Sequence, residues 1–346
     1  MNNYNIEEIS ALSVHRVGNK MNQELLRFSN GELNIDDDIK EILISYFIKP
    51  FKSSEYYTLF HDSDLAMNEV YSYVSLIFDD KESLLEQSKN IARHLYEKST
   101  HPNIKGGEFY TVYFKDCNLD GEIVDAVGLF KSENKDIFLK VQSIDDEFEI
   151  ESDEGVNINK LDKGCLIFNT ERDNGYVVAI VDNTNKSAEA QYWYDDFLHV
   201  HQRKDEYYDT QNVLTMCKNF ITKELPEQFE SSKADQADYL NRSVAFFKDN
   251  ESFDMNEFTD EVIAQPDVID SFNNYKNSFQ EDYKIEIADN FDISNAAVKK
   301  QSRSFKSIIK LDKNFHIYIH GNRNMIEQGV DANGKKFYKI YYDEEQ

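Results

Sequence analysis

The chain has 346 residues, of which 40% are hydrophobic and 13% aromatic, so it holds enough apolar material for two domains, or for one large body with an appended piece. A formal net charge of −27 excludes binding to polyanions such as nucleic acid unless positive charge is gathered in one place. Low proline and glycine contents exclude disordered and fibrous proteins, and three isolated cysteines without a Cys-x-x-Cys pair exclude a disulfide framework or a thiolate zinc site.

The first third of the chain is predicted to be mainly helical. Alternating apolar residues at 9–17, and a segment at 24–28 before Asn30-Gly31, predict two strands. Apolar residues at helical spacing predict helices over residues 36–51, 64–78 and 81–98, and Pro50 marks the end of the first.

Residues 109–181 change to the period of strands. Short apolar runs at 109–114, 124–130 and 137–141 are separated by polar turns such as Asp120-Gly121. Residues 165–168 and 176–181 are predicted to form a hairpin across 173–175. Consecutive short strands of this kind predict an antiparallel meander. The fold class is therefore predicted to be α+β, with a helical N-terminal layer and an antiparallel sheet.

After Trp193 the apolar spacing is helical again, at 213–220, 237–247 and 268–279, and we interpret the aromatic stripes there as core packing. The last segment is predicted to contain a short helix at 294–305, then strands at 307–311, 315–320 and 337–342. We therefore expect an N-terminal α+β domain at 1–204. A C-terminal helical region is expected at 205–346, ending in a basic helix and a small antiparallel sheet.

The charge reverses sign near the C-terminus. Residues 291–340 hold ten Lys/Arg and four acidic residues, a net charge of +6, and we call this stretch the basic segment. On a helix, Lys299, Arg303 and Lys306 share a face, while exposed Tyr and His of the following strands are suited to stacking on unpaired bases. The alternative is a solvated face that balances the acidic remainder. The candidate nucleic-acid-binding residues are Lys299, Lys300, Arg303, Lys306, Lys310, Lys313, Arg323, Lys335 and Lys336.

A metal-dependent nuclease is a less favoured interpretation. Asp125 followed by Glu133-Asn134-Lys135 has the residue types of an acid plus Glu-x-Lys site, in which carboxylates hold Mg²⁺ and the lysine orients water. However, residues 132–136 are predicted to be a polar turn and not a buried strand. No phosphate-binding glycine loop or nucleophile motif is present in the sequence. We therefore predict no catalytic residues, no metal and no cofactor.

Several sequence blocks resemble the bacterial nucleoid-associated family described as NdpA or YejK-like. They are HRVGN (15–19), GEFYTVYF (107–114), DAVGLFKSENKDIFLKV (125–141), KLDKGCLIFN (160–169), YWYDDFLHV (192–200) and IKLDKNFHIYIHGN (309–322). The resemblance implies a cytoplasmic, nucleoid-localised protein that binds DNA and has no recognised enzymatic activity. It implies no particular set of binding residues.

We therefore expect a non-enzymatic, weakly sequence-specific DNA-binding protein that contacts DNA through the basic segment. The alternative is an acidic interaction protein that is recruited to the nucleoid through a DNA-processing partner, or that mimics DNA toward one. Expected partners are DNA and other nucleoid or DNA-topology proteins, and a homodimer would double the basic surface. The N-terminus has no basic stretch before an apolar run, and no apolar run approaches the ~20 residues that span a bilayer, so a cytoplasmic location without membrane contact is expected.

Overall fold

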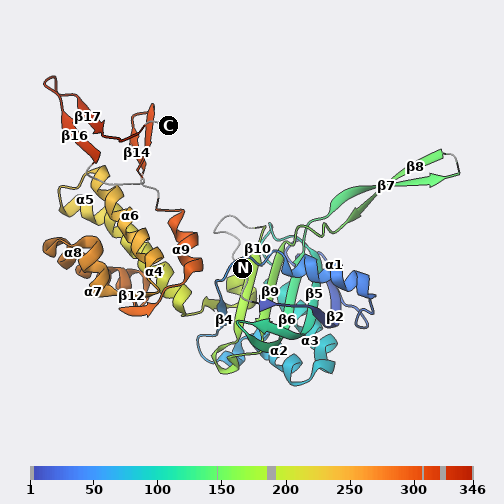
Figure 1. The fold of residues 1–346 in the computed structure, drawn as a ribbon. Helices are drawn as coiled ribbons and strands as arrows, with labels where there is room; N and C mark the ends of the chain where they lie inside the picture. Colours follow the sequence, from blue (N-terminus) through green and yellow to red (C-terminus); the bar gives the residue numbers. More distant parts are fainter. Residues whose placement is uncertain (1–3, 146, 185–191, 306–307, 320–324, 345–346) are drawn as a thin grey trace. The chain divides into compact units, whose positions relative to one another are not determined.

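The computed structural model describes residues 4–145, 147–184, 192–305, 308–319 and 325–344 (Figure 1). The chain divides into two compact units, Met1–Arg203 (unit 1) and Lys204–Gln346 (unit 2). Antiparallel sheets and helices occur in the same chain, which confirms the predicted α+β class. Among the described residues, no helix combines the length and apolarity needed to cross a bilayer.

Unit 1 is built around an antiparallel sheet, in which the described residues contribute nine strands. Their order is β11-β4-β10-β9-β6-β5-β2-β3, and β1 pairs with β5 outside this path. The β5–β6 turn places Asp120 and Gly121 at φ +51° and +94°, the left-handed values that a two-residue hairpin turn requires. The bounds are β1 Tyr4–Asn5, β2 Glu8–Val17, β3 Leu26–Arg27, β4 Tyr57–Leu59, β5 Gly107–Leu119, β6 Glu122–Ser132, β9 Lys163–Phe168, β10 Val177–Asp182 and β11 Val200–Gln202.

Both faces of this sheet are buried. Side chains alternate along β5, so that Phe109 and Tyr113 enter one core while Val112 and Phe114 enter the other. Helices α2 (Glu69–Asp79) and α3 (Leu84–Lys98) cover the first face, and α1 (Asp37–Ile48) covers the second. The three predicted helices are confirmed, and they lie on opposite faces of the sheet (Figure 1).

Strands β7 (Asp136–Ile144) and β8 (Glu147–Gly155) form a separate hairpin, which we call the arm. Figure 1 shows the arm running out from the sheet. The predicted strand at 137–141 exists, but β6 pairs with β9, so the meander does not include it. Strand β8 was not predicted, because five of its nine residues are acidic and hide the alternation.

Unit 2 begins with a helical body. Its helices are α4 (Glu206–Asn219), α5 (Leu225–Gln228), α6 (Lys233–Asp249), α7 (Met255–Phe258), α8 (Pro266–Tyr283) and α9 (Asn295–Ser302), with a short β12 (Ser252–Asp254) and β13 (Asn290–Asp292) pair. The core is rich in aromatic rings, and Phe247 stacks on Phe253 with a centroid separation of 5.2 Å. Val268, Phe272 and Phe279 of α8 are buried in this core, which confirms that the stripe packs in the interior of unit 2.

Two small hairpins end unit 2. They are β14 (Ile308–Leu311) with β15 (Phe315–Tyr318), and β16 (Ile326–Val330) with β17 (Lys336–Ile340). Gly334 has φ +80°, as the predicted turn at Asn333-Gly334 requires. Ile309 of β14, Ile319 just after β15 and Ile326 of β16 pack with Ala234 and Ala237 of α6. The two hairpins therefore rest on the same helix.

Candidate functional site

Helix α9 carries the first group of predicted binding residues. It begins after Ser294, whose hydroxyl accepts the backbone N–H of Ala297. It ends at Ser302 and not at the predicted residue 305, with Arg303 as its C-cap. Lys299 and Arg303 lie one helical turn apart and both are exposed, whereas Ala297 and Val298 are buried.

Lys300 lies beside this pair and has a different environment. Its ammonium is 5.5 Å from the centre of the Tyr207 ring, so it makes a cation–π contact inside unit 2. Lys306, which was predicted to extend the Lys299–Arg303 face, and Arg323 lie outside the described residues. Two of the three residues predicted to share a basic helical face, Lys299 and Arg303, are therefore exposed one turn apart.

The β14–β15 hairpin presents a basic and aromatic face. Lys310 pairs directly with His316 across the strands, and Ile308 pairs with Tyr318, so all four side chains project from one side. Lys310 and His316 are exposed, and Tyr318 is 60% exposed. The opposite side packs toward α6. This arrangement confirms the strand predicted from residue 315, whose predicted last residue, His320, lies outside the described residues.

The remaining predicted lysines occupy hairpin turns. Lys313 lies in the β14–β15 turn, whereas Lys335 and Lys336 lie at the tip of the β16–β17 hairpin. The Asp331 carboxylate accepts the backbone N–H of Lys335, and the side chain of Lys335 stays exposed. The structure therefore distributes the predicted residues over α9 and two hairpins. These elements share α6 as a neighbour through α9, β14 and the apolar contacts of Ile326.

Most exposed cations of the basic segment are not neutralised by an acidic side chain in the described part of the chain. In the described part of unit 2, no carboxylate forms an ion pair with six of them: Lys299, Arg303, Lys310, Lys313, Lys335 and Lys336. Lys339 does have such a partner, since its ammonium is 3.5 Å from Glu327 Oε2. Chemically, the six cations are suited to contacts with phosphate oxygens.

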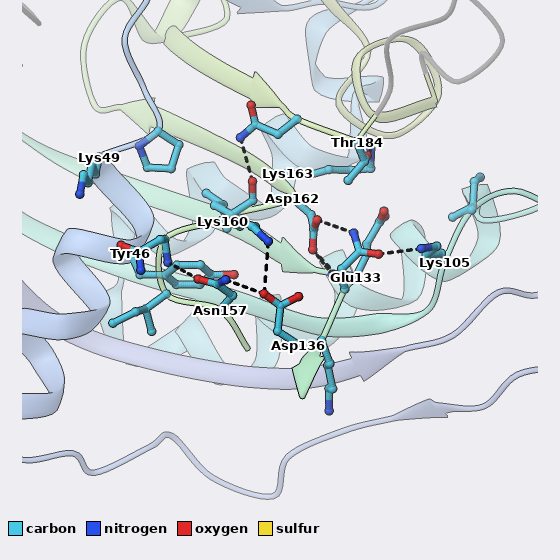
Figure 2. A pocket seen from close by; sticks show the side chains of 18 of the residues that line it. Tyr46, Lys49, Lys105, Glu133, Asp136, Asn157, Lys160, Asp162, Lys163 and Thr184 are labelled. Carbon is cyan, nitrogen blue, oxygen red and sulfur yellow. Dashed lines mark hydrogen bonds and ion pairs between the residues drawn. The ribbon is translucent and has the colours of Figure 1, made fainter. Parts of the chain in front are cut away.

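Unit 1 contains a polar cavity of about 860 Å³ that the sequence did not predict (Figure 2). It lies where the end of α1, the base of the arm and the start of β9 meet. The six lysines that line it are Lys49, Lys52, Lys105, Lys135, Lys160 and Lys163. Three carboxylates also line it, from Glu133, Asp136 and Asp162, so the lining has a net charge of +3 in a strongly acidic chain.

Each of these carboxylates has a partner in the protein. Asp162 accepts the backbone N–H groups of Glu133 and Asn134 at 2.6 and 2.9 Å, and the Asn134 side-chain amide at 2.6 Å. Asp136 pairs with Lys160 at 3.2 Å, and the side chain of Asn157 donates to the same oxygen, as Figure 2 shows. These bonds fix the turn at 133–135 against the start of β9.

Two buried lysines belong to this region: Lys163 lines the cavity, and Lys131 lies next to the lining residue Glu133. Lys131 and Glu133 pair at 3.0 Å with side chains that are 0% and 5% exposed, and Lys163 pairs with Asp182 at 2.8 Å. Tyr192 donates its hydroxyl to Glu133, and its ring centre lies 5.6 Å from the Lys131 ammonium. Burial lowers the pKa of Lys131, while Glu133 opposes that shift. Burial and then Glu133 raise the pKa of Tyr192 well above its ordinary value.

This geometry separates the residues of the nuclease interpretation. Asp125 and Glu133 stand near opposite ends of β6, about 26 Å apart at the rise of a strand. Asp125 accepts the hydroxyl of Tyr113 at 2.6 Å, and Glu133 is held by Lys131. Among the described residues, no three His, Cys, Asp or Glu side chains gather as a metal site would require. Residues 132–136 were predicted as a polar turn, and residues 133–135 do form the turn between β6 and β7, although the Glu133 side chain is only 5% exposed.

One sequence signal for this region was available. Lys131 and Lys163 occur in otherwise apolar strand sequences, GLFK and KGCLIF, where a lysine is buried only if it is paired. The acidic partners of these two lysines are brought to them by the pairing of β6, β9 and β10. The local sequence does not specify that pairing.

A family model described as nucleoid-associated protein YejK matches residues 13–345, a range that contains every block on which the resemblance rests. No curated protein matches the sequence.

Proposed function

The chain belongs to the family of the nucleoid-associated protein YejK, and on that premise we propose that it binds DNA directly, without catalysing a reaction, through the basic segment of unit 2. The observation that carries the proposal is the set of six exposed cations without an acidic partner in the described part of the chain. Lysine ammonium groups contact phosphates as point charges and read no base sequence, so the binding is weakly sequence-specific.

The aromatic face of the first hairpin supports the same proposal. Lys310, His316 and Tyr318 project from one side of β14–β15, so a phosphate contact and a ring surface lie next to each other. Exposed rings beside a cation favour contact with unpaired bases as well as with the backbone. The relative affinity for single-stranded and duplex DNA therefore measures how much the hairpin face contributes.

The test is a charge reversal at Lys299, Arg303 and Lys310, each to Glu. We expect this variant to bind a fluorescent 30-base-pair duplex more weakly, and the slope of log K against log salt between 50 and 200 mM to fall by about 2.7 if three phosphate contacts are lost. The matched control reverses Lys218, Lys223 and Lys248, which carry the same charge elsewhere in unit 2. An unchanged affinity and slope in the first variant would show that the basic segment is not the contact surface.

A partner-mediated role is the second candidate, because the chain outside the basic segment carries a net charge of −33. An acidic surface of this size is suited to the basic DNA-binding groove of a DNA-processing protein. Absence of any DNA shift at 50 mM salt, together with copurification of such a protein in a nuclease-treated extract, would favour this candidate over direct binding.

A further inference from the structure

In the cavity of unit 1, more lysines than carboxylates lack a partner of opposite charge. Lys49 and Lys52 make no ion pair with any described residue, and the Lys105 ammonium is bound to the neutral Asn134 amide at 2.6 Å. Glu133 and Asp136 are each neutralised by a lysine, and Asp162 is satisfied by three N–H groups. In the view of Figure 2, Lys49 and Lys105 lie on opposite sides of these carboxylates.

We propose that this cavity binds the phosphate groups of a nucleoside polyphosphate. A ligand with three or four negative charges would neutralise Lys49, Lys52 and Lys105 without requiring any existing ion pair to break. The cavity volume of about 860 Å³ accommodates a molecule of that size. The side-chain amides of Asn103, Asn159 and Asn183 also line the cavity and supply donors and acceptors for the sugar or base.

The framework for such a ligand is already rigid. Lys163 is 1% exposed and its ammonium is held by Asp182, while the Asp162 bonds fix the 133–135 turn at the other wall. A site in which the surrounding groups are bonded to one another loses little conformational entropy on binding. Only Lys49, Lys52 and Lys105 must become ordered when the ligand binds.

The experiment is calorimetric titration of the full chain with ATP, pyrophosphate, inorganic phosphate and a ten-nucleotide oligothymidylate. We expect ATP to bind, and Lys49→Glu with Lys52→Glu to weaken it about tenfold or more. Lys40→Glu with Lys115→Glu is the matched control in unit 1, since neither side chain lines the cavity.

Three results would overturn the proposal: no binding of ATP at 1 mM, equal losses in both variants, or binding of the oligonucleotide alone. The charge-reversed variant of the basic segment is expected to retain ATP binding. Failure of DNA binding through unit 2 and failure of the cavity proposal are therefore distinguishable.

A second, independent inference concerns the arm. Its register places Val141 opposite Ile150, and Ile137, Leu139 and Phe148 project from the same face. All five side chains are exposed, by 60% for Val141 to 75% for Phe148. The opposite face carries Glu149, Glu151 and Asp153 together with Lys140 and Phe138, whereas Glu154 stands opposite Ile137 on the apolar face. The arm is thus largely amphipathic, and its apolar face is left exposed. Isolated two-stranded hairpins are only marginally stable in water.

We infer that the apolar face of the arm packs against the same face of a second copy of this chain. Five side chains of this exposure amount to about 600 Å² per arm and about 1,200 Å² for two, which reaches the size of a specific interface. Face-to-face pairing leaves Glu149, Glu151 and Asp153 of both arms in water, so these carboxylates are not desolvated. Glu154 lies beside Ile137 at the base of the arm, at the end of the apolar face. A partner recognised by charge would bind the acidic face of the arm, and the apolar face would then stay uncovered.

Adjacent residues of β7 provide a matched test. Val141→Lys places a charge on the apolar face, and Gln142→Lys places the same charge on the acidic face one residue away. We expect sedimentation equilibrium of the full chain at 5–50 µM to give the mass of two chains for the natural sequence and for Gln142→Lys. Val141→Lys is expected to give the 40.5 kDa of one chain. A monomeric natural protein at 50 µM, or identical masses for the two variants, would overturn the inference.

Discussion

The buried histidine of β2 gives the sharpest prediction of pH dependence. His15 is 2% exposed, and its Nδ1 accepts the backbone N–H of Ser29 at 3.1 Å. Its Nε2 lies 2.8 Å from the hydroxyl of Ser88, which itself donates to the carbonyl of Leu85. The Ser88 oxygen therefore accepts a hydrogen bond from Nε2–H. The neutral ring is fully bonded, and a second proton at Nδ1 would break the bond to Ser29.

The magnitude follows from the shift in pKa. Burial first, and then the nearby Lys89 charge, lower the pKa of His15 from 6.5 to about 4. Between these values the unfolded chain binds a proton that the folded chain does not, so the free energy of unfolding falls as the pH falls. The loss approaches about 3 kcal/mol below pH 4 and amounts to about 2 kcal/mol between pH 7.5 and pH 5.

The substitution His15→Gln removes this titration and keeps an acceptor and a donor on the side chain. Urea unfolding of both proteins between pH 7.5 and pH 5 is followed by the fluorescence of Trp193, the single tryptophan, which is buried in the same core of unit 1. We expect the stability of the natural protein to fall by about 2 kcal/mol more than that of the variant. The exposed His101→Gln change serves as a control. Parallel pH curves for the natural protein and His15→Gln would refute the argument.

Three further predictions concern stability. Glu133→Gln leaves the buried Lys131 without its counter-charge and is expected to cost about 3 kcal/mol in the same urea titration, whereas adding Lys131→Met should recover most of the loss. A double variant as unstable as Glu133→Gln alone would contradict this. Asn68→Ala removes the N-cap of α2 and the bonds to the carbonyls of Phe60 and Leu198, so we expect a loss of about 2–3 kcal/mol by fluorescence-monitored unfolding. A loss below about 0.5 kcal/mol would show that these bonds contribute little. Ser232→Ala breaks the capping box of α6 and should destabilise unit 2 by about 1 kcal/mol, as measured by hydrogen exchange in that helix. Unchanged exchange rates there would count against it.

The sequence predicted those features that depend on local spacing. The helices of the first third and the hairpin of β9 and β10 follow from apolar periodicity and turn residues, and the structure confirms them. The arm was missed in part, because the acidic residues of β8 obscure a strand whose apolar face is not buried. The cavity was missed because Lys49, Lys105 and Lys163 come from segments far apart in the chain, and only the completed sheet brings them to one place.

The acidic composition and the basic segment are compatible because electrostatic interactions in salt solution are short-ranged. At about 0.15 M salt the screening length is about 8 Å, so an exposed lysine responds mainly to charges within its own neighbourhood. Lys299, Arg303 and Lys310 have no acidic partner in the described part of the chain, and their effective field is therefore positive although the whole molecule is negative. At 0.01 M salt the screening length grows to about 30 Å, and the acidic residues of the same unit then oppose an approaching phosphate chain. The net charge thus decides how the molecule behaves at long range, while the local pairing of each lysine decides which polyanion it can hold.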